Sequence, residues 1–438
     1  MSDSASGNPL RIGIAGLGTV GAGVLKLLTQ QQDILAARAG VPLVVTAVSA
    51  RNRQQDRGVE IDGYAWYDNC LDMAEADDVD VVVELIGGAD GTAKVLVENA
   101  IAAGKHVVTA NKALLAYHGQ SIAESAEAKA VAVGFEAAVA GGVPVIKGLR
   151  DGLAANQVER IVAILNGTCN FVLGLMEEEE VSFEDAVREA QDVGFAEADP
   201  TTDIGGFDAA HKLSLLASIA FGTQVNLDAV LVKGIDSVAA EDIEAAKELG
   251  YRIKLIAVAD RNGGHIIQRV HPALVPLEQP LAHVGGPGNS IVMQGDWVGT
   301  VEFGGPGAGE KPTASAVVAD IVDIARGFQV PVFGTPAAQL APAKSASEDN
   351  SLAPYYLRME LADKKGTAST MTGILAEHDI SIETMIQKPE EDHELGANMP
   401  VIVVTYATRD TAIAKAIAEI EGAGILAGSP NVIRVESL

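Results

Sequence analysis

Cysteine is scarce in this chain of 438 residues. The two thiols, Cys70 and Cys169, lie far apart and neither belongs to a CxxC pair, so the sequence excludes the common zinc and dithiol redox motifs. So few cysteines fit a reducing compartment, where disulfides are rare. Cys169 follows a predicted strand, but no histidine is well placed to activate it, and we interpret it as a packed, inert thiol.

Long apolar segments and positive charge are also missing. No run of about 18 apolar residues could span a bilayer, and residues 1–9 lack the apolar core of a signal peptide. Lysine and arginine number 31 against 59 acidic residues, a net charge of -28. Because such a surface repels phosphates, we expect no nucleic-acid or membrane partner. The few cysteines and the missing signal peptide and membrane span predict a cytoplasmic location.

Aromatic residues make up 4% of the chain, whereas apolar residues make up 48%. Small and β-branched apolar side chains are typical of buried parallel strands covered by helices, so we predict an α/β protein of two or three domains. Residues 1–144 alternate strand and helix patterns, which predicts a Rossmann-type parallel sheet. The expected strands are Arg11–Ala15, Leu43–Ser49, Val79–Ile86, His106–Thr109 and Val131–Phe135, and the expected helices are Val20–Gln30, Thr92–Ala103 and Ser121–Lys129.

A GxGxxG motif follows the first of these strands and opens a helix. In that context the motif indicates a dinucleotide site, because the glycines allow a tight turn, a close approach of the pyrophosphate and close helix packing. The alternative is a glycine loop that only packs a helix. The residues are Gly16, Leu17, Gly18, Thr19, Val20 and Gly21.

The end of the second strand indicates which dinucleotide binds. An NAD enzyme is expected to have an acidic residue there for the ribose, but this segment reads Ser49-Ala50-Arg51. Arg51 could pair with a 2′-phosphate, which favours NADP, although NAD stays possible and Arg51 could be an ordinary surface arginine.

Three further regions follow the first domain. Residues 145–312 have the pattern of a mixed α+β domain with a tight glycine loop at 304–309. A helix at Thr313–Gly327, within residues 313–337, is expected to return to the first domain. Residues 338–354 have the composition of a linker that detaches the last unit. Residues 355–438 predict strands and helices in the ferredoxin-like order βαββαβ.

Two groups of charged residues suggest chemistry. Asn111-Lys112 follows a predicted parallel strand, at the edge of the sheet where ligands bind. Asp208 and Lys212 are four residues apart on a helix predicted over Phe207–Phe221, and Glu197 and Asp203 precede this helix. A surface ion pair would be the ordinary interpretation of this pair, but the apolar residues around it indicate that the helix is buried.

The segment from Ala190 to Lys212 resembles, position by position, the signature segment of homoserine dehydrogenases. The resemblance extends to Thr109–Lys112, Asn166–Asn170 and Gly305–Gly309, and the C-terminal unit resembles an ACT domain, a fold that often senses amino acids. It covers nearly the whole chain and implies the monofunctional form of the enzyme.

This resemblance implies the reversible, NAD(P)H-dependent reduction of L-aspartate 4-semialdehyde to L-homoserine in threonine, methionine and isoleucine biosynthesis. Lys212 would donate the proton and Lys112 would complete the catalytic site. Glu197, Asp203 and Asp208 would bind the substrate. Gly307, Lys105 and Lys112 would join the cofactor-binding residues of the glycine motif and Arg51.

The resemblance also implies a monovalent cation, expected to be Na⁺, on Glu136, Val139, Gly141 and Val143. It implies that residues 145–312 are a catalytic and dimerisation domain, that the protein is a homo-dimer or tetramer, and that L-threonine could regulate the enzyme through the ACT domain. Two alternatives stay open: a Rossmann oxidoreductase for another amino-acid-derived carbonyl, and a non-catalytic sensor of NADP and an amino acid.

Overall fold

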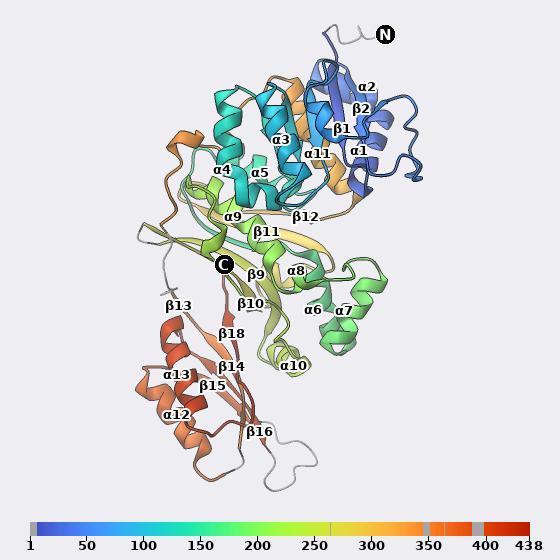
Figure 1. The fold of residues 1–438 in the computed structure, drawn as a ribbon. Coiled ribbons are helices and arrows are strands. Elements are labelled where there is room, and N and C mark those ends of the chain that lie inside the picture. The colour runs from blue at the N-terminus through green and yellow to red at the C-terminus, as the bar shows by residue number, and fades with distance from the viewer. Residues whose placement is uncertain (1–6, 263, 345–350, 363, 388–397) are drawn as a thin grey trace.

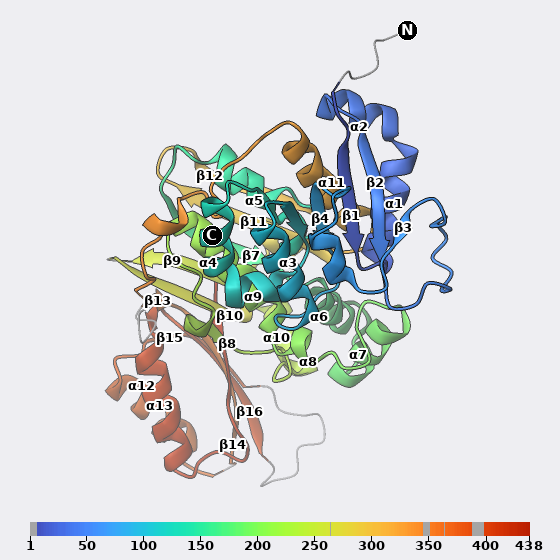
Figure 2. The same ribbon diagram turned by 45° about the horizontal axis from the view of Figure 1, so that its top comes forward.

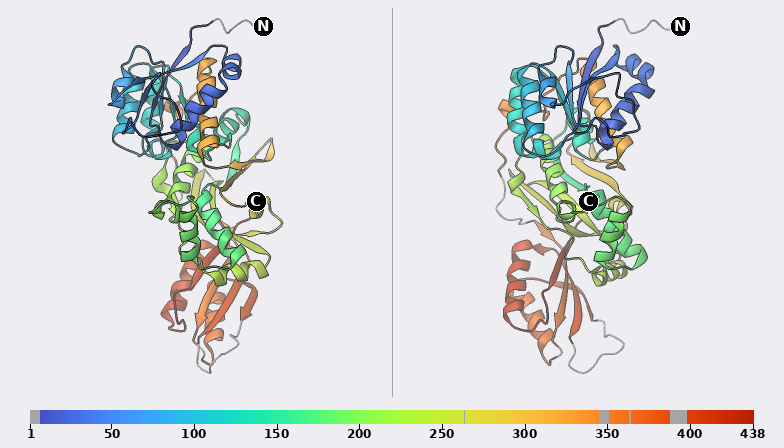
Figure 3. Two further views of the ribbon diagram at one scale, coloured as in Figure 1. Left: turned by 90° about the vertical axis from the view of Figure 1, so that its right-hand side faces the viewer. Right: turned by 45° about the vertical axis from the view of Figure 1, so that its right-hand side comes forward.

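The structure, a computed structural model, describes residues 7–262, 264–344, 351–362, 364–387 and 398–438. Three domains follow one another along the molecule, with the N-terminal domain at one end and the C-terminal domain at the other (Figures 1 and 3). Among the described residues, no helix is both long and apolar enough to cross a membrane.

The first domain is built on a parallel sheet with the strand order β3-β2-β1-β4-β5-β6. β1 lies between β2 and β4, so the order reverses at β1, and ligands of such sheets bind outside the carboxyl ends of the strands at this point. The strands are β1 (Leu10–Ala15), β2 (Leu43–Ser49), β3 (Ala65–Trp66), β4 (Val81–Glu84), β5 (His106–Thr109) and β6 (Val133–Gly134).

Helices cover both faces of this sheet (Figure 2). Side chains alternate along β4: Val81 and Val83 belong to a core with α1 and α11, whereas Val82 belongs to a core with α3 and α4. Alternation of this kind follows from the two-residue period of a strand. The helices are α1 (Thr19–Gln30), α2 (Gln32–Ala39), α3 (Thr92–Ala102), α4 (Lys112–Ala128) and α11 (Glu310–Ala325).

Helix α11 thus returns to the first domain from a distant part of the sequence. It begins at Glu310, three residues before the predicted helix Thr313–Gly327, and it ends at Ala325, close to the predicted end. Gly327 adopts the left-handed conformation with φ +74° and Pro331 follows, and both residues prevent the helix from continuing.

The middle domain carries an antiparallel sheet in the order β12-β11-β7-β9-β10, with β8 parallel to β10. The predicted tight glycine loop is wrong in its first half, because Gly304–Pro306 form the end of β12 and pair with β11. The strands are β7 (Val158–Ile164), β8 (Val230–Val232), β9 (Tyr251–Asn262), β10 (His265–Pro276), β11 (Gly288–Gly295) and β12 (Gly299–Pro306).

Helix α9 lies against β7, β9 and β10 and carries Asp208 and Lys212 in its first turns. Its observed bounds agree with the helix Phe207–Phe221 that the sequence predicts. The helices of the middle domain are α5 (Val145–Lys147), α6 (Gly167–Glu179), α7 (Phe183–Asp192), α8 (Thr201–Ile204), α9 (Phe207–Phe221) and α10 (Ala240–Glu248).

The C-terminal domain has the predicted βαββαβ order, with the strand order β18-β14-β16-β15. Both of its helices pack on one face of this sheet, where Leu357 and Val403 meet Leu375 and Ile420. The elements are β14 (Tyr355–Leu361), α12 (Thr367–Glu377), β15 (Ile382–Gln387), β16 (Met399–Thr405), α13 (Asp410–Gly422) and β18 (Asn431–Val435), and a short pair, β13 (Leu352–Ala353) and β17 (Thr408–Arg409), lies beside them.

The junction between the middle and C-terminal domains corrects the expectation of a detached unit. β18 pairs in parallel with β10, with Arg434 opposite Ala273 and Val435 opposite Leu274, so one sheet runs through both domains. The predicted linker therefore does not separate them in space, although residues 345–350 of that linker lie outside the described residues.

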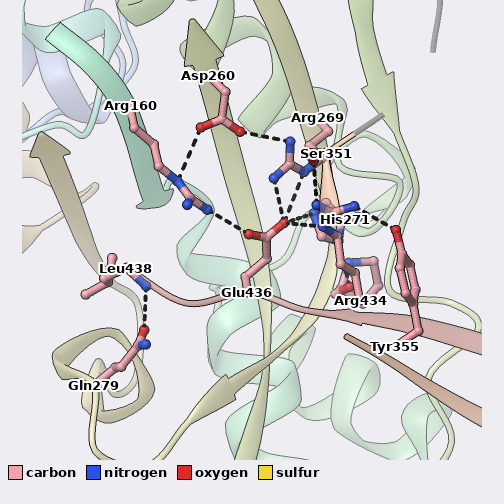
Figure 4. Close-up of polar contacts among 11 residues, drawn as sticks. Arg160, Asp260, Arg269, His271, Gln279, Ser351, Tyr355, Arg434, Glu436 and Leu438 are labelled. Carbon is pink, nitrogen blue, oxygen red and sulfur yellow. Dashed lines mark hydrogen bonds and ion pairs between the residues drawn. The ribbon is translucent and has the colours of Figure 1, made fainter. Parts of the chain in front are cut away.

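A buried charge network closes this junction (Figure 4). The carboxylate of Glu436, 3% exposed, lies 2.7 Å from Arg269 Nη2 on β10, 2.9 Å from Arg160 Nη2 on β7 and 3.0 Å from Arg434 Nε. The reverse arrangement occurs at Asp242 of α10, which accepts hydrogen bonds from Arg358 and other groups of the C-terminal domain. Each domain thus places a buried carboxylate among donors of the other.

Candidate active site

A cavity of about 290 Å³ lies between the first and middle domains. The first domain contributes the start of α1, the start of α4 and Thr313 of α11, and the middle domain contributes the starts of α6 and α9. A larger groove of about 920 Å³ runs over α1, α2 and α11, but the described residues that line it do not include Asp208 or Lys212. The smaller cavity is therefore the candidate active site.

The carboxylate of Asp208 is shared by two lysines at the floor of this cavity. Lys212 Nζ lies 2.7 Å from Oδ2, and Lys112 Nζ, from the first domain, lies 3.0 Å from Oδ1. Burial alone would raise the pKa of Asp208, but the two ammonium groups outweigh it and hold that pKa well below its usual range. Asp208 in turn raises the pKa of Lys112.

Asn166 is a site residue whose role could not be inferred from the sequence. Its Oδ1 accepts a hydrogen bond from Cys169 N and caps α6, and its Nδ2 donates to Asp203 Oδ1 at 2.7 Å and to Asp208 Oδ2 at 2.9 Å. Asn166 therefore holds the two carboxylates together. An asparagine directly before a predicted helix is the capping signal that could have revealed it.

Asp203 and Glu197 differ in their positions. Asp203 lines the cavity, and burial, followed by the charge of Asp208, raises its pKa. Glu197 is exposed and lies outside the residues that line the cavity, although its charge contributes to the raised pKa of Lys112. The structure thus brings Asp203, Asp208, Lys112 and Lys212 together and leaves Glu197 at the margin.

A chain of hydrogen bonds positions Lys112 at the start of α4. Glu84, fully buried at the end of β4, accepts a 2.6 Å hydrogen bond from Thr109 Oγ1, and Thr109 in turn accepts one from Asn111 N. Asn111 then caps α4, because its Oδ1 accepts from Leu114 N. The ends of β4 and β5 thereby fix the first residue of α4, which is Lys112.

The glycine motif forms the turn between β1 and α1. A Cβ on Gly16 would lie 2.4 Å from Leu85 O, and one on Gly21 would lie 2.0 Å from Gly16 O, so only glycine fits at either position. In the described chain, no atom lies within 4 Å of where a Cβ on Gly18 would stand. Gly18 caps α1 without a side chain, so the amides of that helix start can meet an anion such as the pyrophosphate.

Arginines stand beside this loop at the end of β2. Arg51 is exposed, as a residue that meets a 2′-phosphate has to be. Arg57 was not predicted to be part of this site. Its Nε donates a hydrogen bond to Leu17 O at 3.0 Å and connects the segment after β2 to the glycine motif.

The structure contradicts the expected role of Lys105 in binding the cofactor. Lys105 directly precedes β5, so it lies at the opposite edge of the parallel sheet from the glycine motif. Its Nζ donates to Ala76 O and Val79 O, at 2.6 Å each, and closes the loop before β4. β5 itself has the predicted bounds. The error was to place Lys105 at the ligand-binding edge of the sheet, although it precedes this strand.

The segment expected to bind a cation bends sharply beside the cavity. Ala140 and Gly141 both have left-handed φ values, +56° and +50°, which turn successive carbonyl groups in different directions. The carboxylate of Glu136 accepts hydrogen bonds from Ile146 N and Lys147 N, and burial raises its pKa to about 7. Within the described residues, no cluster of His, Cys, Asp and Glu side chains could hold a metal ion, so backbone carbonyls are the ligands that this bend offers.

Cys169 and His211 lie near this site without joining it. Burial raises the pKa of the Cys169 thiol well above its usual value, which disfavours the reactive thiolate. The ring of His211 stacks edge to face on Tyr117, with 5.8 Å between the ring centroids. The arrangement agrees with an inert cysteine.

Comparison with known proteins assigns each domain. Three family models match: "Homoserine dehydrogenase, NAD binding domain" over residues 16–136, "Homoserine dehydrogenase" over residues 144–322, and "ACT domain" over residues 355–422. The homoserine dehydrogenase of Neisseria gonorrhoeae is 42% identical over 98% of this chain and 99% of its own, and that of Pseudomonas aeruginosa is 43% identical over the same shares. A crystal structure of a homoserine dehydrogenase from Thiobacillus denitrificans has a TM-score of 0.92 at 42% identity, covering 98% of this chain and 99% of that one.

These matches set aside the two alternatives from the sequence, a dehydrogenase for another carbonyl and a non-catalytic sensor. The nicotinamide cofactor follows from the first domain, and the substrate pair of aspartate semialdehyde and homoserine follows from the family. The chain belongs to the homoserine dehydrogenase family, and it is an NAD(P)-dependent oxidoreductase of amino-acid biosynthesis with an ACT domain.

Proposed function

We propose that Lys212 donates the proton to the carbonyl oxygen of L-aspartate 4-semialdehyde and removes it from L-homoserine in the reverse direction. The observation that carries this proposal is the pairing of Asp208 with Lys212 and Lys112 at the floor of the cavity. An ammonium group has three N–H donors. Asp208 Oδ2 and Leu165 O take two of those of Lys212, at 2.7 Å each, and the third is available for the substrate oxygen.

When bound, the reduced nicotinamide supplies the hydride. Asp208 and Leu165 hold Lys212 Nζ in place, and Lys112 extends the positive field over the oxygen on which negative charge develops. Protonation by Lys212 then completes the alcohol. The two lysines therefore have separate roles, proton transfer for Lys212 and electrostatic stabilisation beside the nicotinamide for Lys112.

The substrate's own ammonium group requires carboxylates. Asp208 and Asp203 line the cavity, and we assign both of them, together with Glu197, to this role. Glu197 is exposed and does not line the cavity, although its charge acts on Lys112. A smaller effect on KM is expected from Glu197→Gln than from Asp203→Asn.

NADP is the proposed cofactor, although NAD can be used. Arg51 supports this proposal because it is exposed beside the glycine motif and the strand end lacks an acidic residue. A more distant archaeal homoserine dehydrogenase, 27% identical with a TM-score of 0.61, was solved as a mutant in complex with NADPH. Gly307, which also lines the cavity, would contact the cofactor from the middle domain.

A monovalent cation, Na⁺, would be held by carbonyl oxygens of Val139, Gly141 and Val143, together with Glu136. Oxygen ligands from a bent segment suit a hard cation. Its role would be to hold the bend beside the cavity rather than to take part in proton transfer. Replacing sodium by choline at constant ionic strength should lower kcat, and an unchanged kcat would argue against the site.

We also propose a homo-dimer or tetramer. β12 forms an edge of the large sheet, and the turn before it exposes Trp297 at 87% and Val298 at 45%. Large apolar side chains at such an edge are typical of a protein interface. A monomer in sedimentation at micromolar concentration would contradict this proposal. The cytoplasmic location stays a prediction from the sequence.

The test of the proposed chemistry is a rate measurement. Purified protein should oxidise NADPH with L-aspartate 4-semialdehyde and reduce NADP with L-homoserine. A panel of other amino-acid-derived aldehydes should be reduced more slowly, because they do not place an ammonium group and a carbonyl at the same separation. A chain that prefers another aldehyde would overturn the substrate assignment.

A further inference from the structure

A buried lysine outside the proposed catalytic residues lies behind one wall of the cavity. Lys254, on β9, is 3% exposed, and its Nζ donates to Asn170 Oδ1 and to Val284 O, at 2.8 Å each. Burial lowers its pKa to about 8. The charged groups that act on it are Arg252 on the same strand and Glu177 and Glu178 on α6, and Glu177 itself pairs with Arg252 at 2.7 Å.

Asn170 connects this lysine to the loop before β11. Because its Oδ1 faces Lys254, its Nδ2 faces the loop, where it donates to Val284 O at 2.9 Å and to Gly286 O at 2.7 Å. Arg252 donates to Ala282 O at 2.9 Å. Side chains from β9 and α6 thus hold three carbonyl groups of the segment 282–286.

This loop leads directly into the wall of the candidate active site. Pro287 and Asn289 line the cavity together with Gly167 and Lys212. The contact between the loop and α6 is close, because a Cβ on Gly167 would lie 2.6 Å from Pro287 O. Asn289 also packs against Gly307, where a Cβ would lie 1.2 Å from its Oδ1. A displacement of the loop would therefore change the shape of the cavity.

Asn170 also lies four residues after Asn166, which caps the start of α6. Asn166 binds Asp203 and Asp208, and Asn170 binds the loop. The start of α6 thus sets the distance between the carboxylates of Asp203 and Asp208 and the cavity wall that contains Pro287. We propose that Lys254 and Asn170 are positioning residues for the dehydrogenase reaction, which fix Pro287 and Asn289 at the substrate cavity.

A purely structural role explains the lysine less well. A buried charge that contacts only amide and carbonyl oxygens costs stability, and an apolar side chain of the same length would fold at a smaller cost. The amide of Asn170 needs an oriented donor on one side to present its own donors on the other. Lys254 supplies that donor, which a methionine cannot do. The proposal rests on the cavity being the substrate site.

The test compares full-length Lys254→Met and Asn170→Asp with the parent enzyme and with Lys233→Met. Lys233 also donates to a backbone carbonyl, that of Val432, but at the junction with the C-terminal domain. Asn170→Asp keeps the shape and the contact with Lys254, yet it places a carboxylate oxygen opposite Val284 O and Gly286 O. It therefore perturbs the loop even if Lys254→Met folds poorly.

Both variants should raise KM for L-homoserine roughly tenfold or more, since a small displacement of a cavity wall is enough for such an effect. They should lower kcat less than threefold, because Lys212 keeps its partners. Lys233→Met should keep the parent KM. A parental KM in Asn170→Asp would overturn the proposal, and so would an equal loss in Lys233→Met. Failure of the parent enzyme to oxidise homoserine would instead contradict the function itself.

Discussion

Lys112 and Asp208 form an ion pair across the interface of two domains. Lys112 is the first residue of α4 in the first domain, and its Nζ lies 3.0 Å from Oδ1 of Asp208 in the middle domain. The other oxygen of Asp208 is occupied by Lys212. One carboxylate therefore links the dinucleotide-binding half of the site to the half that holds the proton donor.

Lys212→Ala should lower kcat by roughly a hundredfold or more, the usual contribution of general acid–base catalysis. The affinity for NADPH should be nearly unchanged, because Lys212 is in contact with Asp208 and Leu165 and not with the glycine motif. Steady-state rates and NADPH titration by fluorescence measure both quantities. A control outside the cavity is Lys26→Ala, which removes a half-buried pair with Glu310 and should keep kcat. Near-normal kcat in Lys212→Ala would remove this lysine from the mechanism.

Arg51→Asp should shift kcat/KM from NADP toward NAD. Loss of a charge-assisted contact with the 2′-phosphate costs about 1.5–3 kcal/mol, which corresponds to roughly tenfold to a hundredfold in the NADP rate. Arg53 is a matched control two residues away, since its guanidinium lies over the ring of Trp66 at 5.6 Å. Arg53→Ala should keep the parent preference. If the parent enzyme already uses NAD much better than NADP, the assignment of Arg51 is wrong.

Glu436→Gln should lower the stability of the full-length protein at neutral pH by about 3–5 kcal/mol, the usual effect of breaking a buried ion pair. Burial alone would raise the pKa of Glu436, but His271, Arg269 and Arg434 outweigh it, so that pKa lies well below that of an unfolded glutamate. The contribution is thus complete above the unfolded pKa of about 4.3 and is lost as the pH falls. The difference in Tm should shrink on acidification.

Glu419→Gln is the control for that experiment, because Glu419 pairs with His378 on the exposed face of the C-terminal domain. It should change stability by less than about 1 kcal/mol. In calorimetry the parent should unfold its middle and C-terminal domains in one transition, since they share a sheet. Two well-separated transitions in the parent protein would show that the junction does not couple them.

Millimolar L-threonine should inhibit the full-length enzyme if the ACT domain senses the end product. Inhibition requires threonine to bind the less active arrangement more tightly. Removal of residues after about Gln339 is a poor test, because it would expose β10 and leave Asp242 without Arg358. Initial rates with threonine, methionine and isoleucine decide the question instead. If none of the three amino acids changes the rate, the C-terminal domain has a structural role only.

The sequence predicted local features well where periodicity and motif agreed. The bounds of α9 and of β2 and β5 agree with the prediction, because apolar spacing marks all three and Gly206 and Gly222 flank α9. The start of α4 was missed. Gly119 interrupts the helical pattern in the sequence, but in the fold the ring of Phe333 lies 2.8 Å from where its Cβ would stand, so distant packing requires a glycine inside the helix.

Features that join distant segments could not be predicted. Arg434 lies opposite Ala273, although β11, β12, α11 and most of the C-terminal domain separate their strands in the sequence, and no local pattern predicts that pairing. The role of Asn170 depends in the same way on Lys254 and on the loop before β11. The composition of residues 338–354 predicted a linker that separates the middle and C-terminal domains. In the fold, β10 and β18 join these two domains in one sheet.

Two passages of chain between the first and middle domains are in close contact with each other. Gly142 N donates to Pro306 O at 3.1 Å, and a Cβ on Gly141 would lie 2.3 Å from Gly307 O. Gly141 and Gly307 both line the cavity. A side chain at Gly141 would therefore push the two passages apart, and with them the walls of the cavity that the two domains share.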